Sequence, residues 1–231
     1  MDGMKRYAVY YAPPRGEFAS RAAQWLGRDA ESGQTLPPPS GCPAGDHAAR
    51  VAEPCRYGFH ATLKAPFRLV AGRSAGELHE ALARLAEDLA PVRLEGLKLA
   101  RIGSFLALVP ESPSEALQQF AAAVVTGLEP FRASLTGAEM ARRRPERLTE
   151  RQRELLGLYG YPYVLEEFRF HMTLTGPLPE AEAGSVTEFL SGYLAPVAPR
   201  PFLLGEICLF GEPEGGPFRL LHRYPLTASS S

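Results

Sequence analysis

A short strand-like motif is written twice in this chain, and it constrains the fold more than any other feature. The first copy occupies residues 59–63 (FHATL) and the second occupies residues 170–174 (FHMTL), almost half a chain apart. Side chains in an extended strand alternate between two faces. The histidine and threonine of each copy therefore share one face, and the aromatic residue and leucine share the other. Each copy predicts a strand with one face for a core and one face that carries an imidazole and a hydroxyl.

The elements that follow the two motifs also repeat. After the first motif, the hydrophobic pattern predicts a helix over residues 74–89 and a hairpin over residues 92–109. After the second motif, it predicts a helix over residues 180–194 and two strands within residues 201–224. A repeated order of elements is hard to obtain by chance, so it indicates an internal duplication.

This duplication predicts an α+β fold with two lobes, in which two antiparallel sheets face a central cleft and helices cover the outside. Residues 1–231 are expected to form a single domain with interleaved lobes, and the histidine strands are expected near residues 57–65 and 168–176. Residues 33–54 are rich in proline and glycine and predict a long loop, whose composition permits it to act as a lid.

The charge balance and the cysteines argue against several classes of protein. The 25 basic and 26 acidic side chains leave a net charge near zero, which is unusual for a general nucleic-acid-binding protein but compatible with a small anionic substrate. Three cysteines without a C-x-x-C spacing indicate neither a zinc site nor a disulfide framework, and we expect no metal or other cofactor. No apolar run is long enough to span a bilayer, and the first residues lack the apolar stretch of a signal peptide. The expectation is a cytoplasmic protein with a small phosphorylated substrate, no membrane and no obligate protein partner.

The polar faces of the two motifs indicate acid–base chemistry on an anion. An imidazole has an unperturbed pKa of about 6.5, so one of His60 and His171 can accept a proton near neutral pH while the other donates one. Thr62 and Thr173 lie two residues along the same faces, where their hydroxyls can bind the oxygens of a phosphate. If the two faces turn toward each other, they form one site with two histidines.

The same alternation predicts cations beside the histidines. Lys64 and Arg169 are in phase with the neighbouring histidine and are expected on the cleft face as substrate contacts. Arg56 joins them only if the first strand begins that early. A single strand histidine is more often a structural, hydrogen-bonded residue than a catalyst, and it is the two copies in one register that favour function.

Two further groups have a structural and a functional interpretation. Tyr161 and Tyr163 flank a proline ahead of the second motif and are typical packing residues, with stacking on a sugar or base as the alternative. The basic run 142–144, with Arg143 at its centre, is typical of a solvated helix face, with substrate contact as the alternative.

The sequences H-A-T-L at His60 and H-M-T-L at His171 resemble the paired H-x-T/S-x motifs of the two-histidine (2H) phosphoesterase superfamily. The order of elements around both motifs fits the two-lobed fold of that superfamily, so the resemblance covers most of the chain. Residues 142–171 are similar to a bacterial branch described as phosphonate-metabolism proteins because of its gene neighbourhoods. The resemblance implies metal-independent attack on a cyclic phosphodiester, with the two histidines as the acid–base pair and the two threonines binding phosphate oxygens.

The sequence therefore predicts a hydrolase that opens a small cyclic phosphodiester, either a 2′,3′-cyclic nucleotide or a cyclic ribose phosphate, with phosphonate metabolism implied by the resemblance. Two alternatives stay open. One is a duplicated binding module that holds a phosphorylated ligand without turnover. The other is an RNA end-processing protein similar to 2′-5′ RNA ligases, which the near-zero net charge disfavours. The near-symmetric motifs do not say which histidine is the base.

Overall fold

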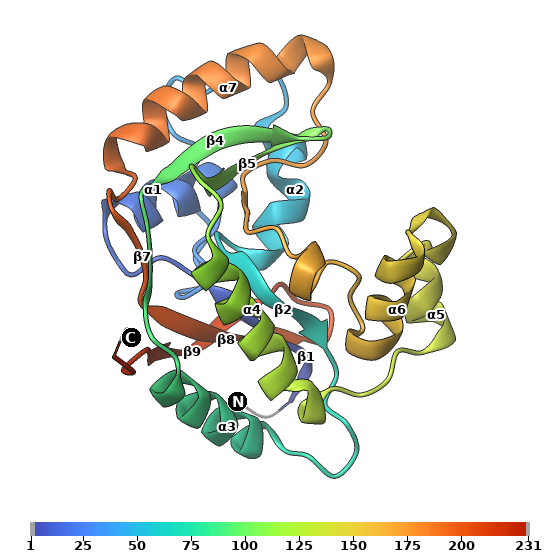
Figure 1. Cartoon of the computed structure of the whole chain (residues 1–231). Helices are drawn as coiled ribbons and strands as arrows, with labels where there is room; N and C mark the ends of the chain where they lie inside the picture. The colour runs from blue at the N-terminus through green and yellow to red at the C-terminus, as the bar shows by residue number, and fades with distance from the viewer. Residues whose placement is uncertain (1–2, 230–231) are drawn as a thin grey trace.

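A seven-stranded antiparallel sheet is the centre of the computed structural model, which describes residues 3–229 (Figure 1). The strand order is β4-β5-β6-β2-β1-β8-β9, and β3 and β7 form a separate two-stranded sheet. The strands are β1 (Met4–Tyr11), β2 (Ala61–Phe67), β3 (Val92–Leu94), β4 (Leu97–Ile102), β5 (Phe105–Pro110), β6 (Met172–Thr173), β7 (Phe202–Leu204), β8 (Glu206–Pro213) and β9 (Arg219–Pro225).

Helices lie around these sheets, so the α+β class and the antiparallel sheets are confirmed. In Figure 1, α7 runs beside the β4–β5 hairpin, α4 crosses in front of β2, and α5 and α6 project from the body as an arm. The α-helices are α1 (Glu17–Leu26), α2 (His47–Tyr57), α3 (Ala75–Asp88), α4 (Glu115–Gly127), α5 (Gly137–Arg142), α6 (Glu150–Tyr159) and α7 (Glu180–Leu194). Short 3-10 helices occupy Glu129–Phe131, Pro145–Arg147, Leu165–Glu167 and Ala195–Val197.

The two repeats exchange their hairpins. The β4–β5 hairpin follows β2 in the sequence, yet β5 pairs with β6 of the second motif. The β8–β9 hairpin follows β6, yet β8 pairs with β1, which in turn pairs with β2. The strands β2 and β6 then pair with each other, so strands of both repeats share the seven-stranded sheet. The interpretation of residues 1–231 as one domain with interleaved lobes stays a prediction, which this exchange supports.

One helix lies where the sequence predicts a loop and the start of a strand. Residues 47–57 form α2, so the prediction of a loop over residues 33–54 is wrong for its last part, and β2 begins only at Ala61. The side chain of Asp46 accepts a hydrogen bond from the N–H of Ala49 at 3.0 Å and caps the helix. Pro54 has no N–H to donate to the carbonyl of Arg50, which is the usual reason that proline ends a helix. Here the N–H of Gly176 donates to that carbonyl at 2.7 Å, so a residue beyond the second motif replaces the missing bond.

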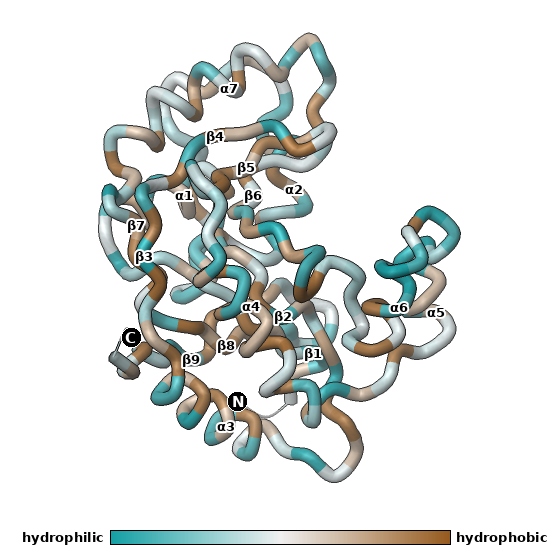
Figure 2. The backbone as a smooth tube through the Cα atoms, in the orientation of Figure 1, coloured by the Kyte–Doolittle hydropathy of each residue, from teal (hydrophilic) through white to brown (hydrophobic). Residues whose placement is uncertain are grey.

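A buried tryptophan ties α1 to the second motif. The side chain of Trp25 is fully buried, and its indole N–H donates to the carbonyl oxygen of Leu174 at 2.8 Å. Figure 2 shows the apolar segments along the central strands, while the turn between α5 and α6 is hydrophilic. Among residues 3–229, no helix has both the length and the apolar character needed to cross a membrane.

Candidate active site

Thr62 and Thr173 lie on adjacent strands at the middle of the sheet, and His60 and His171 directly precede these strands. The strand predicted near residues 168–176 is thus limited to Met172–Thr173. Ala61 of β2 pairs with Met172 of β6 in antiparallel register. In this register, His60 is opposite Thr173 and Thr62 is opposite His171. Side chains at opposite positions on one face of an antiparallel pair have Cβ atoms about 4.5–5.5 Å apart. Two imidazoles and two hydroxyls are therefore concentrated in one patch, formed by His60, Thr62, His171 and Thr173.

Both histidines are held in the same way. Nδ1 of His60 lies 2.9 Å from the carbonyl oxygen of Gly58, and Nδ1 of His171 lies 2.8 Å from the carbonyl oxygen of Arg169. A carbonyl oxygen can only accept, so Nδ1 carries a hydrogen in both rings. Nε2 is then the atom that each ring can offer to a substrate, and in His60 it lies 3.2 Å from Oγ1 of Thr62.

The two imidazoles have different surroundings. The ring of Tyr10 stacks on His60 with a centroid distance of 3.9 Å, and Tyr57 and Phe210 lie at 5.9 and 6.5 Å. Burial, with a smaller contribution from the charge of His171, lowers the pKa of His60 to about 4, although the hydrogen bond to Gly58 acts in the opposite direction. His60 is therefore neutral near pH 7, while His171 is only half-buried and lies 6.0 Å from the ring of Phe105.

A cavity of about 780 Å³ lies beside the two histidine strands. It is walled by β1, the last turns of α2, β2, the segment after β6, and the arm that carries α5. His60, Thr62 and Thr173 line it, whereas His171 is not among its lining residues and borders it through Phe105. Within residues 3–229, no three or more His, Cys, Asp or Glu side chains are grouped so that they could hold a metal ion. The polar side chains that line this cavity carry imidazole, hydroxyl and guanidinium groups and the carboxylates of Glu53 and Glu139.

Three of the further contacts expected from the sequence line this cavity. Arg56 reaches it from the last turn of α2 and not from an early strand, and its Nη2 donates to Oε1 of Glu212 at 3.1 Å. Tyr161 and Arg143 line it together, with the guanidinium carbon of Arg143 lying 5.0 Å from the centre of the tyrosine ring. Burial raises the pKa of Tyr161, so its phenol is protonated at neutral pH.

Two expected contacts point elsewhere. Tyr163 is 45% exposed and does not line the cavity; its ring packs edge-on against Tyr161 at 5.6 Å. Arg169 is exposed, and its Nη1 donates to the carbonyl oxygens of Glu166 and Phe168 at 2.9 and 2.8 Å. These bonds hold the guanidinium of Arg169 against the backbone of the segment before β6, and Arg169 does not line the cavity.

Lys64 corrects a sequence prediction, because it lies in the core and not on the cleft face. Tyr10 pairs with Thr62 and Val9 pairs with Lys64, so β2 has one residue more than β1 over this step. Such a β-bulge turns the following side chain to the other face. The side chain of Lys64 is 3% exposed, and its Nζ donates to the carbonyl oxygen of Val125 at 2.9 Å and to Oε2 of Glu129 at 2.8 Å.

Lys64→Met is expected to lower the free energy of unfolding by about 2 kcal/mol, because it leaves the carbonyl of Val125 without its donor and removes one cation from Glu129. Glu129 keeps its bond from Nε of Arg132 at 2.7 Å, which limits the loss. Urea unfolding followed by circular dichroism measures the change. The exposed Lys98→Met is the matched control and should stay within about 0.5 kcal/mol. Equal stability of both variants would contradict a structural role for Lys64.

The sequence did not identify several residues of this cavity. Tyr10 and Arg6 come from β1, and the guanidinium of Arg6 binds Glu212 through Nε at 2.6 Å and Nη2 at 3.0 Å. The even spacing of Arg6 and Tyr10 in a predicted strand places them on one face. No local sequence pattern indicates that this strand lies beside the first motif. The shared face of Arg6 and Tyr10 could therefore not be assigned to the site without the tertiary structure.

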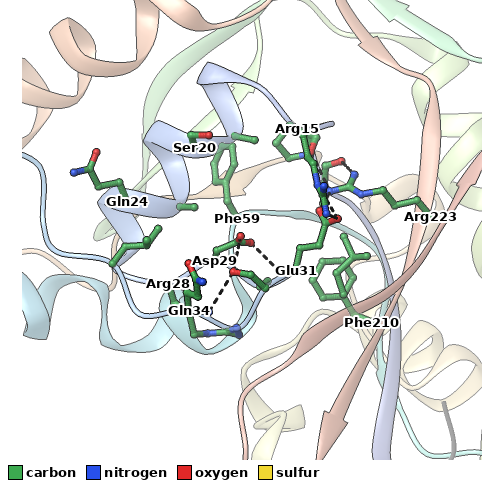
Figure 3. A pocket seen from close by; sticks show the side chains of 18 of the residues that line it. Arg15, Ser20, Gln24, Arg28, Asp29, Glu31, Gln34, Phe59, Phe210 and Arg223 are labelled. Atoms are coloured by element: carbon green, nitrogen blue, oxygen red, sulfur yellow. Dashed lines mark hydrogen bonds and ion pairs between the residues drawn. The ribbon is translucent and has the colours of Figure 1, made fainter.

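A second cavity, of about 590 Å³, is lined by Phe59 and Phe210 and by the region after α1. Figure 3 shows the side chains of Arg15 and Arg223 converging on Glu31. Their distances to its carboxylate are 2.7 and 3.0 Å, so these cations are already compensated. None of the motif histidines or threonines lines this cavity, and the candidate active site is therefore the larger one.

Comparison with solved structures finds chains of similar length. The crystal structure of E. coli LigT in apo form has 17% sequence identity and a TM-score of 0.46, covering 98% of this chain and 100% of that chain. The crystal structure of TT0787 of Thermus thermophilus has 18% identity and a TM-score of 0.46, covering 97% and 100%. Scores at this level do not indicate a shared activity.

Two curated relatives are more similar in sequence. Both are named ribose 1,5-bisphosphate phosphokinase PhnN. The protein of Laribacter hongkongensis (strain HLHK9) is 38% identical over 220 residues, which are 93% of this chain and 50% of that protein. The protein of Janthinobacterium sp. (strain Marseille) is 33% identical over 234 residues, which are 98% of this chain and 52% of that protein. The chain thus spans about half the length of the curated relatives that it matches.

A family comparison covers most of the chain, including β2 after its first residue, the arm with α5 and α6, and the second motif. The matched residues are 62–219. Because this match extends over more than half of the sequence, the chain belongs to the family described as "Protein of unknown function (DUF1045)".

Proposed function

We propose that the chain is a metal-independent phosphoesterase of the 2H type, which hydrolyses a small cyclic phosphodiester by acid–base catalysis. The observation that carries the proposal is the crossed arrangement of the motifs, in which each histidine lies opposite the other motif's threonine and both rings have Nδ1 occupied by a backbone carbonyl. With Nδ1 bound to the backbone, Nε2 is the nitrogen that each ring can turn to a substrate, and in His60 it lies beside the hydroxyl of Thr62. The two imidazoles supply both proton transfers that hydrolysis requires, so the reaction needs no metal-bound water.

The different surroundings of the rings suggest their roles. His60 is neutral, and its Nε2 can accept a proton from a water molecule as the water oxygen attacks phosphorus. The ester bond from phosphorus to the ribose oxygen then breaks, and His171 in its protonated form donates a proton to the departing oxygen. Thr62 and Thr173 donate hydrogen bonds to the non-bridging oxygens, where negative charge increases in the transition state. Proton exchange with solvent restores both rings.

The substrate class is proposed from the relatives' name. Opening a cyclic phosphodiester of ribose leaves a ribose phosphate monoester, and the name of the curated relatives includes such a compound, ribose 1,5-bisphosphate. This favours a cyclic ribose phosphate over a nucleotide, and the resemblance of residues 142–171 to phosphonate-metabolism proteins supports a place in phosphonate metabolism. The phosphokinase activity in that name is not assigned to this chain, because the chain covers half of those proteins and contains no G-x-x-x-x-G-K-S/T phosphate-binding motif.

The direct test is a set of purified substrates. Cyclic ribose phosphates, 2′,3′-cyclic nucleotides and linear phosphodiesters are incubated with the protein in EDTA, and phosphate monoesters are measured. We expect hydrolysis of at least one cyclic substrate and none by a variant that lacks both histidines. If a phosphorylated ligand raises the melting temperature while every cyclic substrate stays intact, the protein is a binding module and the proposal is wrong.

The pH dependence of the reaction is expected to show the low pKa of His60. The base acts only when it is neutral, so kcat/KM should persist below pH 6.5 and fall as pH drops through about 4. Steady-state rates between pH 3.5 and 8 measure this fall of kcat/KM at acidic pH. Each sample is then returned to pH 7 and assayed again to exclude irreversible unfolding. A cyclic phosphodiester does not titrate in this range. An acid limb near pH 6.5 would contradict the role of a buried His60 as the base.

A further inference from the structure

The arm that carries α5 and α6 contributes a wall of the histidine cavity with its own charges. In Figure 1 the arm leaves the body after α4 and returns before β6. Arg142 and Arg143 at the end of α5 line the cavity, as does Tyr161 at the base of the arm. These side chains are therefore presented to whatever the histidine strands bind.

Several arginines near the cavity have an acidic partner. Arg68 is paired with Glu139 at 3.0 Å, and Arg151 bonds to Glu154 at 2.9 Å. In the cavity itself, Arg6 and Arg56 share the carboxylate of Glu212. Two of the arginines that line the cavity, Arg6 and Arg56, are thus compensated within the protein.

Arg142 and Arg143 are different. Within residues 3–229, neither side chain makes a hydrogen bond or an ion pair, and the guanidinium of Arg143 contacts the ring of Tyr161. Glu139 also lies on α5, but its carboxylate is bound to Arg68 and to the N–H of Thr136 at 2.8 Å. Glu53 lines the cavity from α2, on another wall, and likewise has no partner among the described residues. Two adjacent guanidiniums are therefore left uncompensated at the arm wall.

The guanidinium carbon of Arg143 lies 5.0 Å from the centre of the Tyr161 ring, and none of its N–H groups is bound by another described residue. A guanidinium binds a phosphate or carboxylate through two parallel hydrogen bonds, and two such groups together suit a dianion better than a monoanion. The cavity, at about 780 Å³, has the size of a site for a whole small molecule and not only for one phosphate.

We propose that Arg142 and Arg143 form a second anion subsite, so that the substrate carries a terminal phosphate monoester in addition to the phosphodiester at the histidines. This inference rests on the proposed function and adds the substrate's second charged group and the residues that select it. It describes a doubly phosphorylated small molecule. The phosphate of a longer RNA strand is a monoanionic diester and would use such a dianion site less well.

The test compares substrates that differ by one group. Adenosine 2′,3′-cyclic phosphate is assayed with a free 5′-hydroxyl, with a 5′-phosphate, and with a second adenosine linked through that phosphate. A hydrogen bond to a charged group contributes about 1.5–3 kcal/mol, which corresponds to roughly 10- to 150-fold. We expect kcat/KM for the 5′-phosphorylated substrate to exceed that for the 5′-hydroxyl substrate by at least about tenfold, and to exceed that for the dinucleotide. In the double variant Arg142→Gln/Arg143→Gln, the ratio of the first two should fall to about threefold or less.

The control is Arg144→Gln/Arg147→Gln, which removes the same charge from the same arm at exposed residues outside the cavity lining. It should keep the wild-type ratio. Equal rates on both mononucleotides by the wild type, or equal loss in both double variants, would overturn the subsite and leave the proposed hydrolysis intact. A faster reaction with the dinucleotide would overturn it in favour of RNA.

A binding measurement separates the subsite from the reaction. If no cyclic substrate is hydrolysed, the proposed function fails, and calorimetry with 3′-AMP and adenosine 3′,5′-bisphosphate still tests the arginines. We expect the bisphosphate to bind at least about tenfold more tightly, with this advantage lost only in Arg142→Gln/Arg143→Gln. Equal affinities, or no binding of the bisphosphate, would overturn the subsite as well.

Discussion

His60→Ala and His171→Ala are each expected to lower kcat/KM for a cyclic phosphodiester by at least about 10²-fold, because each variant removes one of the two proton transfers. The losses should not add in the double variant, since the two imidazoles act on the same transition state. Initial rates on the best cyclic substrate, with EDTA present, measure both effects. Full activity in either single variant would exclude a two-histidine mechanism.

A matched control separates this effect from unfolding. His222→Ala removes an exposed imidazole on β9, outside the lining of the histidine cavity, and should keep the wild-type rate. Circular dichroism and urea unfolding then show whether each variant is folded at the assay temperature. A fall in rate that is equal in all three single variants would indicate a general loss of structure and contradict the assignment of the site.

The two histidine variants should also differ from each other. His60 is enclosed by Tyr10, Tyr57 and Phe210, and its replacement by alanine leaves a gap among aromatic rings. His171 is half-buried at the border of the cavity, so its removal should cost less stability. We therefore expect a lower unfolding free energy for the His60 variant at a similar loss of activity.

Trp25→Ala is expected to reduce the free energy of unfolding by about 3–5 kcal/mol, the largest stability effect that we anticipate. The indole is fully buried, its N–H bonds to the carbonyl of Leu174, and its ring meets His47 edge-on at 4.8 Å and Phe189 at 5.7 Å. The substitution opens a cavity between α1, α2 and α7 and leaves a buried carbonyl without a donor. Urea unfolding must be followed by circular dichroism, because Trp25 is the only tryptophan.

Two further variants separate the contribution of the hydrogen bond from that of the buried apolar volume and provide a control. Trp25→Phe keeps most of the apolar volume and loses the hydrogen bond to Leu174, so a loss of about 1–3 kcal/mol is expected. Leu158→Ala changes a side chain that is 60% exposed and should stay within about 0.5 kcal/mol. A Trp25→Ala variant as stable as the Leu158 variant would contradict the place of the indole in the core.

Strand periodicity made part of the candidate site predictable. Phe170, Met172 and Leu174 are buried, while His171 and Thr173 between them are more open. This alternation follows from the covalent geometry of an extended chain, so it can be read from adjacent residues. The catalytic roles assigned to these side chains stay predictions until the variants are measured.

The wrong predictions share a cause. Lys64 turned into the core because β2 contains a bulge opposite β1, and a bulge depends on the partner strand. Pro54 lies inside a helix because Gly176, more than a hundred residues later, supplies the hydrogen bond that proline cannot. In both cases a local rule was overridden by a group that is distant in the sequence.

The sequence by itself determined the apolar and polar faces of the two motifs, the repeated order of elements and the α+β class, because each depends on side-chain spacing along a short stretch. It did not determine the bounds of the motif strands, since β2 begins after His60 and β6 is only Met172–Thr173. Only the tertiary structure decided that β2 and β6 are neighbours, that Tyr10 covers His60, and that Arg142 and Arg143 line the same cavity. These arrangements arise when distant segments pack to bury apolar surface and pair their backbone groups. The sequence of one segment does not specify which other segment it will pack against.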